Sequence, residues 1–448
     1  MNRLPAPAGL LIDRERTVNF SFENRRVEGY EGDCIASALA ANDRWLLTRS
    51  FKYHRARAVL SMAGQDANTL VQLPGAPNTL ADREPIVADL QVYGQNYTGS
   101  LDDDREAWIG RFARFLPVGF YYKAFFKPRG VWEKWAPLIR KKAGLGVVDA
   151  RARPGYFDKQ YLFCDVAVVG AGPAGMEAAL SAAEAGAEVI LVDENPLPGG
   201  SLCYARFDVE GSQAEAVRVE LVAAVEAHAN IRLLTDATVN GWFSDNWLPI
   251  IKGNRLHKTR ASECILAVGS LEQPAIFHNN DLPGVMFGSA AQRLIKLYGV
   301  RPGKRAVVLT GNDDGYAVTL DLLDAGVEIA ALVEMREESP AGAIAGAVAE
   351  RGVTLYQGHT VYAALGSSGN RHLRGVDVRR IETRGQCAGT GVKIDCDLLC
   401  MSVGYVPTYQ LACQAGAQLD YDDESARFAL RDLPAALHIA GSVRGQHE

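Results

Sequence analysis

The chain has 448 residues, of which 48% are hydrophobic and 22% charged, and its formal net charge is −6. This composition is typical of a soluble globular protein with about two to four domains. The acidic balance argues against a nucleic-acid partner, and no apolar run is long enough to cross a membrane. The N-terminus lacks the apolar core of a signal peptide, and the eight cysteines form no CxxC pair. We therefore expect a cytoplasmic protein with reduced thiols and no metal site.

Residues 1–101 are expected to form a small α+β domain. Val18, Phe20 and Phe22 alternate with polar residues, and a turn at Glu23-Asn24 leads into a second strand, which predicts a β-hairpin. Asp33 is expected to cap a short helix that runs to about Ala41. Another strand is expected at Leu70–Leu73.

Residues 102–160 are aromatic and basic and are expected to form a linker. From Tyr121 to Gln160 there are ten Lys/Arg residues and three Asp/Glu residues.

From Tyr161 onward the pattern is α/β, and it begins with a dinucleotide-binding motif between Cys164 and Glu194. An apolar strand meets a glycine turn, an alanine-rich helix follows, and a second apolar strand ends at an acid. The first glycine permits the turn, the second lets a pyrophosphate approach, and the third lets the helix pack on the sheet. The helix N-terminus supplies N–H groups and partial positive charge. The acid Asp193 is expected to accept from a ribose 2′-hydroxyl and to disfavour a 2′-phosphate.

Later glycine turns at the ends of strands are expected to face the same cofactor. The expected contacts are Gly170, Gly172, Pro173, Ala174, Gly175, Asp193, Glu194, Gly199, Gly200, Val239, Gly269, Gly441 and Ser442.

A second strand–turn–helix–strand unit begins at Arg305, with its turn at residues 311–315. Asp313 and Asp314 would repel a phosphate at this helix N-terminus, so this unit is expected to be structural or at most a weak nucleotide site. The fold class is therefore α/β: two Rossmann-like domains, one inserted in the other, preceded by a small ferredoxin-like α+β domain. The expected dinucleotide-binding domain combines residues 161–285 and 401–448, and the degenerate domain is 286–400.

The chain resembles the α subunit of heterotetrameric sarcosine oxidase and related amine or opine dehydrogenase subunits, within the FAD/NAD-linked disulfide-reductase superfamily. The resemblance extends over the whole chain. Its distinctive motifs are RSFKYHR (49–55) and GFYYK (119–123), with WEKWAPLIRKKAGLG (132–146) and the two glycine turns. It implies NAD bound in this chain, FMN at a subunit boundary, and a flavoprotein β-type partner that carries FAD and oxidises a small secondary amine.

The sequence departs from this family in two places. The chain ends at Glu448, so the family's folate-binding C-terminal half is expected to be absent. Gly441 is followed by Ser442, where FAD-binding members usually have an acid that holds the ribityl chain. This difference favours NAD in the first site and leaves FAD as the alternative.

Related subunits with a [2Fe–2S] cluster need a C-x₄-C-x₂-C run. Ser61, Asp66 and Thr69 fall at that spacing here, and Cys34 stands alone, so no iron–sulfur cluster is expected.

Two groups of residues are candidate contacts with a partner. The first group is basic and is expected to bind a flavin phosphate or an acidic partner; it consists of Arg49, Lys52 and Arg55. The alternative is that these residues form a solvated basic loop. The aromatic residues favour either a subunit interface or an internal clamp onto the core. These residues are Tyr121, Tyr122, Phe125, Phe126, Trp132 and Trp135. Cys203 is interpreted as a structural thiol because no second cysteine lies nearby.

The function expected from these observations is that of an NAD-binding α subunit in a sarcosine-oxidase-like complex. The alternatives are a free-standing FAD/NAD(P)H-dependent oxidoreductase and a non-catalytic nucleotide-binding scaffold. No residue has the setting of a general base or nucleophile, so no catalytic residue is assigned.

Overall fold

The computed structural model describes residues 2–117, 119, 125, 127–153, 155–423 and 426–445. It divides into two compact units, each built from two stretches of chain. Unit 1 combines Met1–Ala152 with Pro274–Ser402, and unit 2 combines Arg153–Gln273 with Val403–Glu448. The finer division into domains given above stays a prediction.

The N-terminal part of unit 1 contains the expected hairpin, formed by β1 (Asp13–Phe22) and β2 (Arg25–Glu31). Phe20 and Phe22 point inward and are buried, as their alternation predicts. The further elements of this part are α1 (Ile35–Ala41), β3 (Thr48–Arg49), β4 (Ala56–Arg57), η1 (Ala67–Thr69), β5 (Leu70–Leu73), β6 (Ala76–Leu80) and β7 (Gln91–Val92).

The cap of helix α1 differs from the expectation. Cys34 is the N-cap residue, and its Sγ accepts from the Ser37 N–H at 3.4 Å. Asp33 lies one residue earlier, and its carboxylate accepts from the Tyr30 N–H and the Ser37 hydroxyl and pairs with Arg3. Asp33 therefore ties the hairpin to the helix and to the N-terminus rather than capping the helix.

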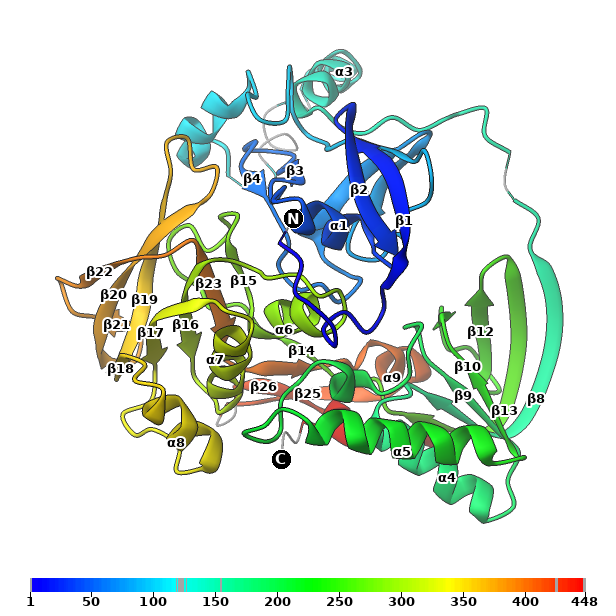
Figure 1. Ribbon diagram of the computed structural model, residues 1–448. Coiled ribbons are helices and arrows are strands. Elements are labelled where there is room, and N and C mark those ends of the chain that lie inside the picture. Colours follow the sequence, from blue (N-terminus) through cyan, green and yellow to red (C-terminus); the bar gives the residue numbers. More distant parts are fainter. Residues whose placement is uncertain are drawn as a thin grey trace. The chain divides into compact units, whose positions relative to one another are not determined.

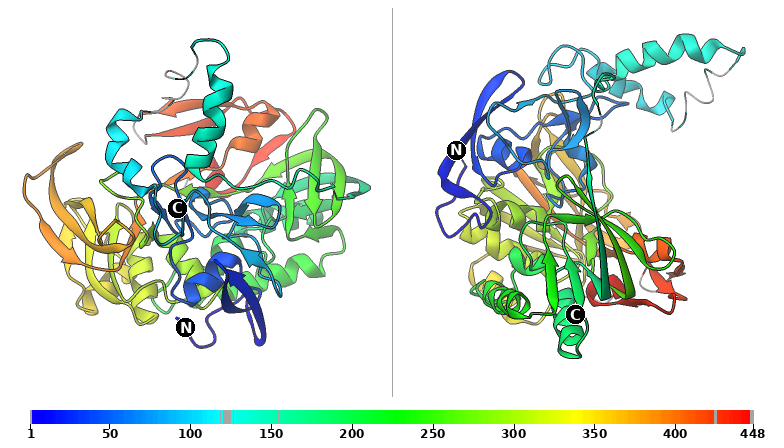
Figure 2. Two further views of the ribbon diagram at one scale, coloured as in Figure 1. Left: turned by 90° about the horizontal axis from the view of Figure 1, so that it is seen from above. Right: turned by 90° about the vertical axis from the view of Figure 1, so that its right-hand side faces the viewer.

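The stretch expected as a linker contains two helical elements, η2 (Ala107–Phe115) and α3 (Val131–Ala143). Both expose large apolar side chains, and α3 lies at the margin of the N-terminal part, away from α1 (Figures 1 and 2). Lys142 near the end of α3 pairs with Glu106, just before η2. Tyr121, Tyr122 and Phe126 lie outside the described residues.

The second part of unit 1 is a Rossmann-like layer with a parallel sheet in the order β15-β23-β16-β17-β18. The helices of this layer are α6 (Gly288–Lys296), α7 (Asp314–Asp324) and α8 (Ala343–Glu350). Its strands are β15 (Val285–Phe287), β16 (Arg305–Thr310), β17 (Glu328–Glu334), β18 (Leu355–Gln357) and β23 (Leu398–Ser402). An antiparallel sheet is inserted, made of β19 (His359–Gly366), β20 (Leu373–Thr383), β21 (Gln386–Cys387) and β22 (Val392–Asp395).

Polar contacts join the two parts of unit 1. Asp281 pairs with Arg57 at 2.6 Å and with Arg55 at 3.3 Å. The Phe287 N–H donates to the Leu60 carbonyl at 2.8 Å. These contacts attach the 54–61 segment to residues 281–287, which lie far from it in sequence.

Unit 2 is a sheet in the order β10-β9-β8-β13-β12-β11, with α4 (Pro173–Glu184) and α5 (Gln213–Ala227) packed against each other beside it (Figure 1). Its principal strands are β8 (Asp158–Val169), β9 (Val189–Val192), β10 (Ile231–Leu234), β11 (Ala237–Val239), β12 (Trp247–Lys252) and β13 (Arg255–Leu266). The remaining elements are η3 (Gly200–Cys203), β14 (Ser270–Glu272), β24 (Tyr405–Pro407), α9 (Gln410–Ala415), β25 (Gln418–Asp422), β26 (Arg427–Arg431), β27 (Leu437–Ile439) and η4 (Gly441–Arg444).

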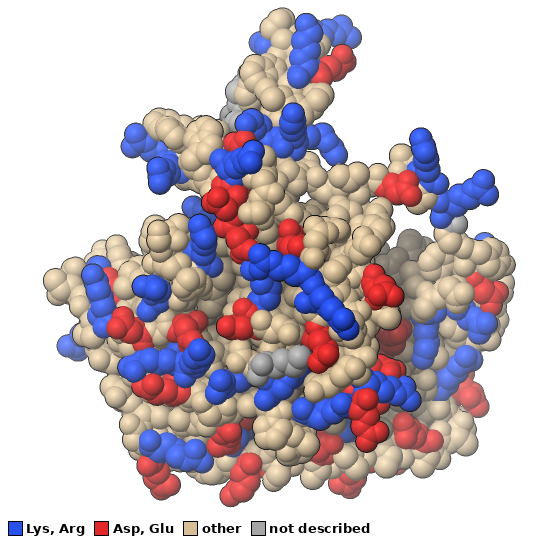
Figure 3. All heavy atoms as spheres, turned by 45° about the horizontal axis from the view of Figure 1, so that its top comes forward, with Lys and Arg blue, Asp and Glu red and all other residues tan. Residues whose placement is uncertain are grey.

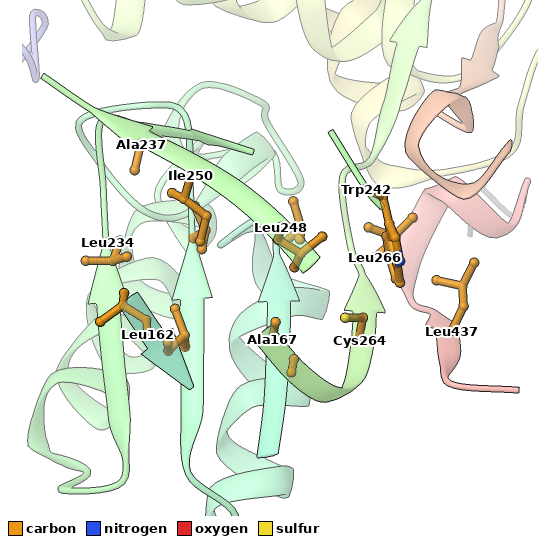
Figure 4. Packing of buried hydrophobic residues seen from close by; sticks show 14 of the residues in the cluster. Leu162, Ala167, Leu234, Ala237, Trp242, Leu248, Ile250, Cys264, Leu266 and Leu437 are labelled. Atoms are coloured by element: carbon orange, nitrogen blue, oxygen red, sulfur yellow. The ribbon is translucent and has the colours of Figure 1, made fainter. Parts of the chain in front are cut away.

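Strand β13 has two neighbours along one edge. Its first half pairs with β12, and Cys264–Leu266 pair in parallel with β27 from the C-terminal stretch. The core beneath these strands includes Leu162, Leu248 and Ile250 (Figure 4). The α/β class with Rossmann-like units, predicted from the sequence, is confirmed.

Candidate dinucleotide site

The expected glycine turn lies at the carboxyl end of β8, where the chain enters α4. Gly170 has φ +100°, and a Cβ at this position would lie 2.4 Å from the Ala267 carbonyl oxygen. A Cβ on Gly175 would lie 1.8 Å from the Gly170 carbonyl oxygen. Both glycines are therefore required by the packing of helix, turn and sheet.

Gly172 is different, because the protein itself does not require a glycine there. Its φ of −72° is open to any residue, and a Cβ would have no neighbour nearer than the Gly200 Cα at 3.9 Å. Gly172 is the N-cap of α4, where free N–H groups and the helix dipole face the turn. A glycine that leaves open space at a helix N-terminus is what a closely approaching pyrophosphate needs.

The other predicted glycine turns of unit 2 converge on the same place. Gly200 has φ +56°, and a Cβ there would lie 2.9 Å from the Gly172 Cα. Gly441 faces Ala174, since a Cβ on it would come within 2.8 Å of the Ala174 Cβ. The Ser442 Oγ lies 3.8 Å from where a Cβ on Gly269 would be. Val239 lies on β11, which packs near β9.

Asp193 follows β9, and its side chain is turned into the protein. Oδ2 accepts from the Ala171 N–H at 2.7 Å, while Oδ1 accepts from the Asn195 N–H at 2.8 Å and its side-chain amide at 3.0 Å. Burial raises the pKa of Asp193, and these N–H donors partly offset that rise. The carboxylate thus fixes the glycine turn, and the adjacent Glu194 is the exposed acid. The Asp-x-Asn pattern of an Asx turn was the signal that sequence reasoning missed.

The second turn, at residues 311–315, contains an ion-pair network. Arg336 pairs with Asp313 at 2.8 Å and with the fully buried Glu334 at 2.9 Å. A Cβ on Gly315 would lie 2.2 Å from the Thr310 Oγ1, so this glycine serves helix packing. Asp313 therefore has a partner within the chain, and the interpretation of this turn as structural stays a prediction.

The three basic residues expected to form an anion site do not share one. Arg49 is buried, and its guanidinium donates to the Leu101 carbonyl at 2.8 Å and the His54 carbonyl at 2.9 Å. Lys52 donates to the Pro117 carbonyl, and Arg55 pairs with Asp281. Burial lowers the pKa of Arg49, and the main chain holds the side chain in place. The Arg49 side chain is enclosed by the fold, and its expected contact with a flavin phosphate or an acidic partner stays a prediction.

The 60–69 loop, which contains the three positions at cluster-ligand spacing, is organised by two buried carboxylates. Asp66 accepts from the N–H groups of Leu60, Ser61 and Asn68. Asp82 accepts from the Gly64 N–H at 2.8 Å and the Thr69 hydroxyl at 3.0 Å. Burial raises the pKa of Asp66 to about 6. In the described part of the chain, no group of three or more His, Cys, Asp or Glu residues is placed to hold a metal ion.

Comparison with known proteins defines the class to which this fold and site belong. The family described as pyridine nucleotide-disulphide oxidoreductase matches residues 164–426. The match extends over more than half of the chain, and the chain belongs to this family.

Within the family, the chain is similar to the alpha subunit of sarcosine oxidase. It is 35% identical to that subunit from Rhizobium meliloti (strain 1021), over 99% of this chain and 45% of the relative. It is 28% identical to the subunit from Corynebacterium sp. (strain U-96), over 98% of this chain and 42% of the relative. The chain thus spans less than half the length of these relatives. An opine oxidase subunit from Agrobacterium tumefaciens (strain Ach5) is 26% identical over 63% of this chain and 62% of its own length.

Among solved structures, L-proline dehydrogenase from P. horikoshii superposes with a TM-score of 0.66 at 20% identity. The superposition covers 98% of this chain and 71% of that chain, which supports the fold. In the described residues, no helix is both long and apolar enough to cross a membrane.

One expectation about cofactors is corrected by these comparisons. The family described as 2Fe-2S iron-sulfur cluster binding domain matches residues 15–97, which contradicts the expectation that the chain has no such cluster. The expectation rested on the three non-thiol residues at the ligand spacing and on the single Cys34, whereas the match extends over residues 15–97. The residues present do not supply the usual four thiolates, because Cys34 is the single cysteine in this range. No reaction step is therefore assigned to a cluster.

Proposed function

We propose that unit 2 binds the ADP part that NAD and FAD share. In this proposal the pyrophosphate lies over Gly172 and the α4 N-terminus, and Glu194 accepts from the adenosine ribose. Asp193 does not contact the ligand and instead holds the glycine turn in place through its hydrogen bond with the Ala171 N–H. The observation that carries the proposal is the open space at Gly172, which neither the backbone angle nor the packing of the protein explains.

The test is a substitution that fills this space without disturbing the fold. Gly172→Ala should keep the free energy of unfolding within about 0.5 kcal/mol, because its φ is ordinary and the Cβ has room. Dinucleotide affinity should fall at least about tenfold, because the new methyl group occupies the path of the pyrophosphate. Titration calorimetry with NAD and reconstitution with FAD measure the two candidates separately.

Gly346→Ala is the matched control, because Gly346 lies in α8 of unit 1 with nothing within 4 Å of its Cβ position. Unchanged affinity of Gly172→Ala for both NAD and FAD would place the ligand elsewhere.

We further propose that the chain acts as the dinucleotide-binding part of an α-type subunit in an amine-oxidising complex, with the oxidation on a flavoprotein partner. The similarity to the alpha subunit of sarcosine oxidase supports this function. In the described residues the candidate site holds no paired base and nucleophile, so this chain's own residues bind and orient a cofactor.

The exposed face of η2 and α3 is the proposed contact with the partner. Trp108, Phe112 and Phe115 of η2 and Trp132 and Trp135 of α3 are each at least 40% exposed. Arg140 and Lys141 follow in the last turn of α3. Figure 3 shows Lys and Arg side chains beside uncharged and acidic ones on the uppermost projection of that view. Exposed aromatic and basic residues together are typical of an interface.

Co-expression with a β-type flavoprotein subunit tests this contact. Trp132→Ser with Trp135→Ser should reduce recovery of the complex at least about fivefold, since exposed aromatics are frequent anchors of interfaces. Val392→Ser, an equally exposed apolar position on β22, is the control and should have no effect. Oxidation of a secondary amine by the chain alone with added flavin would contradict the proposed division of labour.

A further inference from the structure

A second exposed surface lies on unit 2, on the outer face of β8, β13 and β12. The strand register places Phe163, Arg260 and Trp247 side by side in one row across the three strands. The next row holds Tyr161, Lys258 and the buried Pro249. We call these two rows the aromatic–basic face.

Two of the three aromatic side chains of this face are open to solvent, although their strand is part of the sheet of unit 2, and the third, Trp247, is half-buried. Phe163 is 74% exposed and Tyr161 is 67% exposed. The opposite face of the same strands is core, because Leu162, Leu248 and Ile250 are buried there. Period-two alternation in a one-sided sheet would normally place polar residues at the outer positions. Large aromatic side chains there form an exposed apolar patch, and such patches often mark interaction sites.

The face is also hollowed. Phe163, Tyr161, Trp247, Lys258 and Arg260 line a depression of about 220 Å³. The Lys258 Nζ lies 5.1 Å from the centre of the Tyr161 ring, so the cation is held over the aromatic surface. A depression of this size accommodates a large side chain.

The charge of the face is one-sided, because its two rows contain two cations and no acid. Arg260 pairs at 3.3 Å with Asp245, whose side chain is 80% exposed. Such a surface pair is weak and exchangeable. The Lys258 Nζ lies 3.4 Å from the Tyr161 hydroxyl, and no carboxylate of the described chain pairs with it. The face can therefore receive carboxylates from outside.

Charge also distinguishes between the possible occupants. A second copy packed by two-fold symmetry would bring two more cations and no acid of these rows to the contact, so the cations would gain no opposite charge there. An occupant with acidic and apolar side chains would pair with the cations and fill the depression.

We propose that the aromatic–basic face is a docking surface for a segment of a partner protein that combines acidic and large apolar side chains. Carboxylates of this segment pair with Lys258 and Arg260, and an apolar side chain enters the depression between Phe163 and Trp247. The proposal is independent of the dinucleotide site, and it is separate from the contact proposed for η2 and α3.

The test uses the full chain and two labelled twelve-residue peptides. In the first, Leu and Phe are interspersed with Asp, Glu and Ser, and in the second every acid is replaced by Lys. Fluorescence anisotropy should show saturable binding of the acidic peptide, weakened by added salt, and none of the basic peptide. Lys258→Glu combined with Arg260→Glu should lower the affinity for the acidic peptide at least about tenfold. Phe163→Ser should also lower this affinity, but the salt dependence of binding should stay unchanged.

The control is Arg380→Glu with Lys393→Glu, which makes the same change in net charge at exposed positions on the inserted sheet of unit 1. This control should bind the acidic peptide like the native chain. The proposal is overturned if the control loses as much affinity as Lys258→Glu with Arg260→Glu, if the basic peptide binds equally, or if neither peptide binds. It is also overturned if light scattering shows a dimer that Phe163→Ser dissociates, because a second copy would then occupy the face.

Discussion

Asp193 and Glu194 are adjacent acids with different surroundings. Asp193 is 7% exposed and accepts three hydrogen bonds, whereas Glu194 is exposed. An acid at the end of the second strand is easily recognised in the sequence, but its contacts depend on the path of the turn. The packing of the Ala171 N–H against Asp193 is a tertiary feature that strand–turn–helix spacing does not encode.

This difference predicts that two conservative substitutions affect different properties, stability in one case and dinucleotide binding in the other. Asp193→Asn should lower the free energy of unfolding by about 1–3 kcal/mol, because an amide cannot accept at both ends and leaves a buried N–H unpaired. Glu194→Gln should leave stability unchanged, lower dinucleotide affinity, and reduce discrimination against a ribose 2′-phosphate. Urea unfolding and calorimetry with NAD and NADP measure the two quantities. Equal loss of stability in both variants would contradict the assignment of roles.

At the scale of elements, the regular units are predictable from the sequence and the connections are not. Strand β16 is predictable from its apolar run, and the end of helix α7 is predictable from the glycine that follows it, Gly326. Helix α3 departs from the expected linker. Trp132, Trp135 and Ile139 recur at the spacing of one helix face, a helical signal that the sequence analysis did not use, and both tryptophans remain exposed. The N-cap of α1 lies one residue later than predicted. Asp33 has the side chain that N-cap positions prefer, but Cys34 is the residue with the backbone geometry of an N-cap. Tertiary hydrogen bonds override local propensity in that case.

The 60–69 loop predicts a dependence of stability on pH. The pKa of Asp66 is raised by burial from 3.8 to about 6, so the folded state disfavours its charged form. The contribution of this group to stability is therefore complete below about pH 4 and is lost as the pH rises through 6, by on the order of 3 kcal/mol at most. In Asp66→Asn this component of the pH profile between 4 and 6 should vanish. Urea unfolding across this range measures it, with Asp420→Asn on exposed β25 as the control. A profile identical to that of the native chain would show that Asp66 does not titrate there.

At the scale of unit 1, the N-terminal part is held to the Rossmann-like layer by Asp281. Burial alone would raise the pKa of Asp281, but Arg57 and Arg55 outweigh it and lower the pKa. This stabilisation is present at neutral pH and is lost as the pH falls through the lowered pKa. Asp281→Asn should reduce stability by about 1–3 kcal/mol at pH 7 and by less at pH 3.

Hydrogen exchange locates the effect of this substitution. The amides of β3, β4 and the loop that ends at Leu60 should exchange faster in Asp281→Asn, while those of β8 and β9 in unit 2 keep their native rates. Faster exchange throughout both units would indicate global destabilisation instead of a local tether.

The pairing of β27 with β13 has a consequence for how the protein is made. A ribosome delivers β8, α4 and β9 early, but Leu437–Ile439 follow only after all of Pro274–Ser402 has been synthesised. Until then Cys264–Leu266 present an unpaired strand edge, which is a template for unwanted association. The second stretch of unit 1 can meanwhile complete its parallel sheet, because β15 to β23 are already available. The second stretch of unit 1 can therefore complete its sheet before the sheet of unit 2 gains its last strand, β27.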